Sequence, residues 1–212
     1  MTINYISFIT ELNQQFSKMP KLITEDLIRQ WFIDTQSLTY SETIIEKPYK
    51  LLSINKKSSV VINNRARADL YYQEHGKEDV VVEFKYHKKI DTSTTCKTTN
   101  LGEVLRDLNR LSCLNNKEKY FIYVFDKEMK DYYDNAYTKY KDLEFLSINN
   151  ANGKYHIGAN LDIAKLPKNV QDVAFSPFSK SYKKFANFDY DINVNPVNIP
   201  TTDYYLIVIK VL

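Results

Sequence analysis

The feature that most constrains the fold is a pair of β-branched and aromatic segments joined by a polar link. The first segment runs from Arg65 to Tyr72, the second runs from Asp79 to His87, and the link between them contains Gly76. Segments of this composition on either side of a short polar link predict an antiparallel β-hairpin. The chain is therefore expected to build a sheet around these two strands.

Charged and apolar side chains alternate along the second segment. Side chains alternate faces along a strand, so Glu83, Lys85 and His87 are expected on one face and the apolar residues between them on the other. A hairpin symmetric about Gly76 places Asp69 opposite Glu83, with Cβ atoms about 4.5–5.5 Å apart. Two carboxylates this close require a proton or a cation between them. A divalent metal is the simplest such cation.

This arrangement resembles the PD-(D/E)XK, or restriction-endonuclease-like, nuclease superfamily. The likeness consists of Asp69 followed by Glu83-Phe84-Lys85 on an apolar strand, within residues 40 to 125, and it departs from the family pattern at Ala68, where a proline is often found. The resemblance implies that Asp69, Glu83 and the Phe84 backbone carbonyl bind Mg²⁺, for which Mn²⁺ is expected to substitute. Hard oxygen ligands suit Mg²⁺, which keeps several waters. Lys85 would orient the attacking water or help to deprotonate it.

The same resemblance implies an α/β fold with a restriction-endonuclease-like core. Its mixed central sheet would be flanked by helices, in the order α-β-β-β-α-β. We expect a single nuclease-like domain over residues 1–212, with N-terminal helices in 1–40, the core and its hairpin in 41–126, and a C-terminal helix and strand extension in 127–212. The implied activity is Mg²⁺-dependent endonucleolytic hydrolysis of phosphodiester bonds in DNA, in a restriction, phage-defence, mobile-element or recombination role.

Family members usually carry a helix before the sheet that adds another acid to the metal site. The candidates for this acid are Glu25, Glu42 and Glu46. An acid in the first helical turn also suits the helix dipole by itself, so Glu25 has an alternative interpretation. The residues expected to contact nucleic-acid phosphates are Arg65, Arg67, Lys88, Lys89, Arg106 and Arg110. For the last two, solvated charges with an i,i+3 pair from Asp107 to Arg110 are the alternative.

Other interpretations of the motif stay open. Glu-x-Lys occurs again at Glu128 and Lys130, in a polar helical stretch without a facing acid, so the spacing alone is weakly specific. If the pattern marks no catalytic site, the hairpin face is an ordinary exposed surface. Alternatively, the chain is a catalytically inactive nuclease-fold subunit that binds nucleic acid or protein. An RNA-directed nuclease is a third option. The histidines are too scattered for a zinc site or a hydrolase triad, and His87 is interpreted as a surface residue at a strand end.

Composition sets few limits on function. The net charge of +3 and pI near 8.6 permit nucleic-acid binding without arguing for it. Cys96 and Cys113 have no metal-like spacing, which favours a reducing cytoplasm. No apolar stretch approaches about 18 residues, so no membrane partner is expected.

Periodicity predicts the remaining elements. A stripe of apolar residues from Leu101 to Leu111 gives the clearest helix, and the apolar run 119–125 reads as a buried central strand. A strand at 204–212 is expected to close the sheet or to form a subunit interface, which is the basis for considering a homodimer. Helices are also predicted at 3–16, from Thr24 and at 127–143, strands at 42–49, 51–55, 60–62 and 154–157, and mostly irregular structure elsewhere in the last third.

Overall fold

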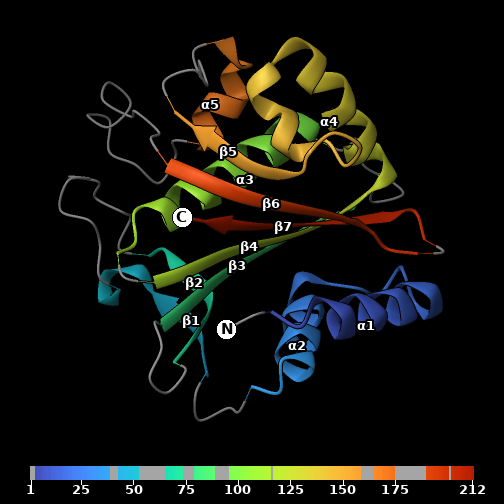
Figure 1. Cartoon of the computed structure of the whole chain (residues 1–212), viewed down its shortest axis with the longest axis vertical. Coiled ribbons are helices and arrows are strands. Elements are labelled where there is room, and N and C mark those ends of the chain that lie inside the picture. Colours follow the sequence, from blue (N-terminus) through green and yellow to red (C-terminus); the bar gives the residue numbers. More distant parts are fainter. Residues whose placement is uncertain are drawn as a thin grey trace.

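A computed structural model of the chain describes residues 3–38, 43–52, 65–73, 79–88, 96–115, 117–158, 165–174, 190–200 and 202–212. These residues form a mixed α/β structure around one 7-stranded sheet, with strand order β1-β2-β3-β4-β7-β6-β5 (Figure 1). The strands are β1 (Thr43–Pro48), β2 (Arg67–Tyr72), β3 (Asp79–His87), β4 (Lys117–Asp126), β5 (Gly153–Ile157), β6 (Tyr190–Asn198) and β7 (Tyr204–Val211). The helices are α1 (Tyr5–Lys18), α2 (Glu25–Thr35), α3 (Lys97–Ser112), α4 (Lys127–Lys139) and α5 (Lys168–Ala174), with short 3₁₀ helices η1 (Tyr49–Leu51) and η2 (Lys141–Leu146).

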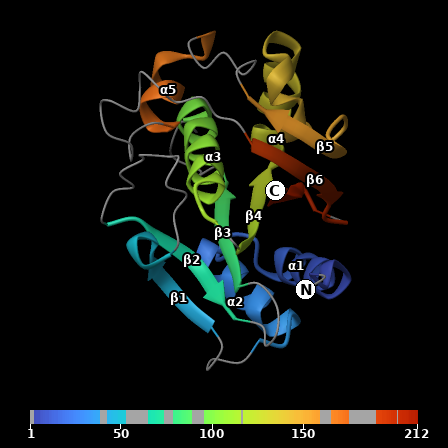
Figure 2. The ribbon, with the colours of Figure 1, turned by 60° about the vertical axis from the view of Figure 1, so that its left-hand side comes forward.

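The sheet is mostly antiparallel. Among the described strand pairs, β3 and β4 run parallel and the others run antiparallel. Parallel neighbours need a crossover connection, and α3 lies in the chain between these two strands. The crossover brings α3 alongside β3 (Figure 2), on the face of the sheet where Lys85 and His87 of β3 contact Asp107 and Glu103 of α3.

Helices cover both faces of the sheet. Helices α1 and α2 lie on one face, and α3, α4 and α5 lie on the other (Figure 1). Each face has its own apolar core: the first includes Phe8, Phe32 and Phe84, and the second includes Leu105 and Phe121. Strand β4 is buried on both faces, which confirms the predicted central strand.

Local sequence explains the helices that frame the site. Helix α2 begins after Thr24, whose side chain accepts a hydrogen bond from the Leu27 N–H at 3.3 Å, as expected of an N-cap residue. Helix α3 buries the predicted apolar stripe, including Leu101 and Leu108, against the sheet. It also buries Asp107, which the apolar stripe did not indicate.

The last third of the chain is more regular than predicted. The predicted strands near residues 154–157 and 204–212 are present as β5 and β7, but α5 and β6 fall where irregular structure was expected. In β6 the buried residues Tyr190, Ile192 and Val194 alternate with exposed polar ones. Pro196 obscured this pattern. It is tolerated because the pairing of β6 with β5 ends at Val194, so Pro196 pairs with β7 alone among the described strands.

Strand β7 lies inside the sheet. It pairs with β4 on one side and with β6 on the other, so both edges of β7 are hydrogen-bonded to strands of the same chain. The suggestion that this strand forms a subunit interface is therefore wrong, and it gives no support for a homodimer. The strands predicted at 51–55 and 60–62 fall almost entirely outside the described residues. None of the described helices is long and apolar enough to cross a membrane.

Candidate active site

The predicted hairpin is present with the predicted register. Strands β2 and β3 pair through Tyr72 with Val80 and Leu70 with Val82, and the next step of this register sets Asp69 opposite Glu83. The two faces of β3 are also as predicted: Val82 belongs to the core beneath α1 and α2, while Val81, on the same face as Glu83, belongs to the core beneath α3.

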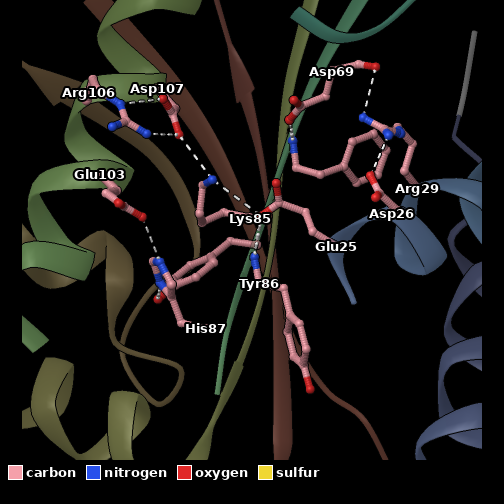
Figure 3. A network of polar contacts seen from close by, with 12 residues as sticks. Glu25, Asp26, Arg29, Asp69, Lys85, Tyr86, His87, Glu103, Arg106 and Asp107 are labelled. Atoms are coloured by element: carbon pink, nitrogen blue, oxygen red, sulfur yellow. Dashed lines mark hydrogen bonds and ion pairs between the residues drawn. The ribbon is translucent and has the colours of Figure 1, made fainter. Parts of the chain in front are cut away.

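Two carboxylates bind the edge of β3 just beyond the paired residues. The backbone N–H of Phe84 donates to Oδ2 of Asp69 at 2.7 Å, and that of Tyr86 donates to Oε2 of Glu25 at 3.0 Å (Figure 3). Side chains thus satisfy backbone donors that a neighbouring strand would otherwise bind. Since the N–H and C=O of one strand residue point to the same edge, the Phe84 carbonyl also lies on the Asp69 side.

Of the three candidate further acids, the structure brings Glu25 to the site. Its carboxylate lies 3.3 Å from Nζ of Lys85, besides its bond to β3. Glu46 is directed elsewhere, because its carboxylate binds Arg29 at 3.2 Å. Glu42 lies outside the described residues.

The backbone of β1 is irregular opposite Asp69. Strand β1 pairs with β2 through Ile45 with Leu70 and through Lys47 with Ala68, and between these pairs Glu46 has φ of 56°. A side chain in this left-handed region is costly. Arg29 bridges the irregular segment, since its Nη1 lies 3.2 Å from the Glu46 carboxylate and 3.5 Å from the Asp69 carbonyl oxygen.

Lys85 lies between carboxylates that come from the two faces of the sheet. Its Nζ is 3.3 Å from Glu25 of α2 and 3.8 Å from Asp107 of α3 (Figure 3). Burial lowers the pKa of Lys85, but the charges of Asp107, Glu25 and Asp69 outweigh it and hold this pKa above its ordinary value. Lys85 is therefore a cation at neutral pH, suited to holding a phosphate or a water rather than to accepting a proton.

Glu83, like Asp107, is an almost fully buried carboxyl of the site. It is 2% exposed, and burial together with the charges of Asp69 and Asp107 raises its pKa well above the ordinary range. Burial also raises the pKa of Asp69, against hydrogen bonds from Phe84 and Glu83, and the pKa of Glu25. Burial is the largest cause of the shift in all three carboxyls, so their charged forms are disfavoured unless a proton or a cation lies nearby.

Helix α3 presents a polar stripe to β3. His87 Nε2 lies 3.1 Å from Glu103, and one helical turn along the stripe Lys85 meets Asp107. One turn further, the positive charge of Arg110 lowers the pKa of Glu83. The i, i+4, i+7 spacing of Glu103, Asp107 and Arg110 on α3 is the sequence signal that could have indicated this polar stripe.

Arg106 and Arg110 are held within the stripe. Nε of Arg106 is 2.9 Å from the Asp107 carboxylate and Nη1 of Arg110 is 3.0 Å from it. The i,i+3 pair of Asp107 and Arg110 exists as predicted, but the interpretation of a solvated pair is wrong because the Asp107 side chain is 3% exposed. The arginines neutralise a buried acid.

The other predicted phosphate contacts lie in different settings. Arg67 at the start of β2 and Arg65 just before it are exposed, and Nη1 of Arg67 donates to the Glu46 carbonyl at 3.1 Å. Lys88 donates to the carbonyls of Lys21 and Ile23 at 2.9 and 3.1 Å, which ties the end of β3 to the loop before α2. Lys89 lies outside the described residues.

Two residues of the site were missed or misread in the sequence. His87 is buried, with Nδ1 2.9 Å from the Tyr123 hydroxyl, so its interpretation as a surface residue is wrong. Tyr49, fully buried, donates its hydroxyl to Oε1 of Glu83. Nothing local in the sequence marks Tyr49, because its contact depends on how η1 packs.

The site fits a magnesium ion in part. The described residues contain no group of three or more His, Cys, Asp or Glu side chains arranged to hold a metal. Mg²⁺, however, keeps several waters and needs only one or two protein carboxylates. Asp69 and Glu83, with raised pKa values, and the nearby Phe84 carbonyl are of the right chemistry for it.

Comparisons with known proteins add no further assignment. No family model matches the chain, and neither the curated proteins nor the solved structures contain a match.

Proposed function

We propose that this protein is a Mg²⁺-dependent endonuclease of the restriction-endonuclease-like type that hydrolyses phosphodiester bonds in DNA. The observation that carries the proposal is the meeting of Asp69, Glu83 and Lys85 at one edge of β3, with Glu25 joining from the preceding helix. The order from α2 to β4 supports it: a helix, three antiparallel strands, a helix and a strand parallel to the third. This is the order that the PD-(D/E)XK resemblance implies.

The metal would be held by Asp69, Glu83 and the Phe84 carbonyl. When bound, Mg²⁺ supplies positive charge to the phosphoryl oxygens and makes its coordinated water more acidic. The protein's own contribution is to hold the two carboxyls together in a buried setting, where burial disfavours their charged forms and the charge of Asp69 acts on Glu83, so a cation is favoured. Mn²⁺ is expected to substitute.

Lys85 and Glu25 would prepare the attack on phosphorus. Lys85 keeps its proton because of the surrounding carboxylates, so Nζ can donate to the attacking water or to a phosphate oxygen. Glu25, held by the Tyr86 N–H, fixes the position of that ammonium group. Attack in line with the leaving oxygen would leave a 5′ phosphate and a 3′ hydroxyl, as the resemblance implies.

Exposed basic residues next to the site would hold the DNA backbone. Arg65 and Arg67 are the best placed of the predicted set, since both are exposed at the start of the strand that carries Asp69. Arg106 and Arg110 would act mainly by neutralising Asp107. Restriction, phage-defence, mobile-element and recombination roles all fit such an activity.

The test compares Glu83→Ala with a matched control on plasmid and single-stranded DNA, in Mg²⁺, in Mn²⁺ and in chelator. Glu128→Ala is the control, because Glu128 begins the second Glu-x-Lys copy but lies on α4, 3.7 Å from Lys97. We expect metal-dependent nicking by the wild type and by Glu128→Ala. Glu83→Ala should lose about 10²-fold or more, as when one main electrostatic contact to a transition state is removed.

The other outcomes decide between the alternatives. DNA binding without cutting in any metal would support the catalytically inactive binding subunit. Cutting of labelled RNA but not of DNA would assign the same site to RNA. Equal nicking by wild type and Glu83→Ala would place the activity outside this site and contradict the proposal.

A further inference from the structure

Tyr49 is fixed in place before its hydroxyl reaches the site. It opens η1 directly after β1, its N–H donates to the Ala66 carbonyl at 3.0 Å, and its carbonyl accepts from the Leu52 N–H at 2.9 Å. Its ring is fully buried in the core between the sheet and α3. The phenol therefore has little freedom to move.

The hydroxyl of Tyr49 donates to Oε1 of Glu83. A buried tyrosine hydroxyl usually has a hydrogen-bond partner, so such a bond alone does not indicate function. Here the partner is a carboxyl of the candidate site that is itself only 2% exposed. One of its two oxygens is thus committed to Tyr49, which restricts rotation of the carboxyl and limits how it can face Asp69.

We propose that Tyr49 is a positioning residue that orients the Glu83 carboxylate for metal binding. The proposal rests on the proposed function, because it assumes that Glu83 is a metal ligand. Tyr49 itself touches neither metal nor substrate. Partners that orient a ligating side chain commonly contribute about 10–100-fold to metal affinity, and Tyr49 is the oriented donor that the structure gives to Glu83.

The discriminating variant is Tyr49→Phe, which keeps the ring and removes the hydroxyl. The matched control is Tyr190→Phe: the Tyr190 hydroxyl is also buried in this core but donates to Oδ1 of Asn109 at 2.9 Å rather than to a carboxyl. A purely structural hydroxyl would lower the melting temperature in both variants alike. A positioning hydroxyl would in addition weaken metal binding in Tyr49→Phe alone.

Mn²⁺ is the probe, and its binding is measured by calorimetry on the full chain together with the Mn²⁺ concentration needed for half-maximal nicking. In Tyr49→Phe we expect the Kd for Mn²⁺ and the Mn²⁺ concentration for half-maximal nicking each to rise about tenfold. The maximal nicking rate should be largely recovered at saturating Mn²⁺. In Tyr190→Phe neither the Kd nor the half-maximal concentration should change. Equal Mn²⁺ affinity in Tyr49→Phe and wild type, with Glu83→Ala clearly weaker, would overturn the role of Tyr49 and leave the nuclease proposal intact. Equal Mn²⁺ affinity in wild type and Glu83→Ala would overturn both the role of Tyr49 and the nuclease proposal.

A second measurement covers the case in which Tyr49→Phe does not fold. Placing 3-fluorotyrosine at position 49 keeps the ring and the hydroxyl, and its ¹⁹F resonance reports on the bond to Glu83. Saturating Mg²⁺ should shift this resonance, whereas 3-fluorotyrosine at position 190 should show no shift. A signal at position 49 that does not respond to Mg²⁺, while calorimetry shows Mg²⁺ bound, would contradict the proposal.

Discussion

Lys85 of β3 and Asp107 of α3 form an ion pair of 3.8 Å that joins the sheet to its crossover helix at the candidate active site. The same Asp107 binds Arg106 and Arg110, so one buried carboxylate organises three cations. The face of β3 that carries the candidate site is therefore held by α3, and the stability of the fold and the geometry of the site depend on the same acid.

Asp107→Asn is expected to destabilise the protein by about 3 kcal/mol, because removing one partner of a buried pair leaves the other charges uncompensated. Urea unfolding measures the change. Asp131→Asn is the control: Asp131 pairs with Lys127 at 2.8 Å, but both side chains are about half exposed, 49% and 59%. Its loss should cost less than about 1 kcal/mol. Similar losses for the two variants would contradict the importance of Asp107.

Without metal, the protein should lose stability as the pH rises above about 4.5. Burial and the charges of Asp69 and Asp107 raise the pKa of Glu83 above its ordinary value of 4.5, so between these two values the folded chain binds more protons than the unfolded chain. The contribution of Glu83 is complete below the ordinary pKa and falls through this window. In urea unfolding with chelator, Glu83→Gln should reduce the decrease of the unfolding free energy with pH. At neutral pH, Mg²⁺ should stabilise the wild type more than this variant. An unchanged slope in Glu83→Gln would show that other groups set the pH dependence.

Glu46→Gly should be more stable than Glu46→Ala by about 1–2 kcal/mol. Both variants lose the contact with Arg29, but only alanine keeps a Cβ in the left-handed region, where φ is 56°. Thermal unfolding of the two variants side by side gives the difference. A more stable alanine variant would mean that the segment relaxes to an ordinary strand conformation.

Gly102→Ala should destabilise the protein by about 1–3 kcal/mol, although alanine is the better helix former. An added Cβ would lie 2.7 Å from Cβ of Val173 and 3.0 Å from the Val170 carbonyl oxygen, so α3 and α5 could not keep their present approach. Calorimetric unfolding of this variant tests the contact. A rise in melting temperature would mean that α5 shifts away from α3 at little cost.

Local patterns in the sequence determined the hairpin and much of the sheet. Two-residue alternation put Glu83 and Lys85 on one face of β3, and the symmetry of the hairpin set Asp69 opposite Glu83. Apolar periodicity also found α3 and the buried β4. These features are predictable because neighbours in sequence produce them. Where a proline interrupted the alternation, at Pro196 in β6, prediction failed.

Only the tertiary structure decided which distant residues complete the site. Glu25 looks like any acid in the first turn of a helix until the packing of α2 brings it within 3.3 Å of Lys85. Asp107 and Tyr49 look like a surface acid and a core aromatic until α3 and η1 dock on β3. Such contacts join segments far apart in the chain, and the burial that raises the pKa of Glu25 and of Tyr49 arises only when the sheet and helices pack together.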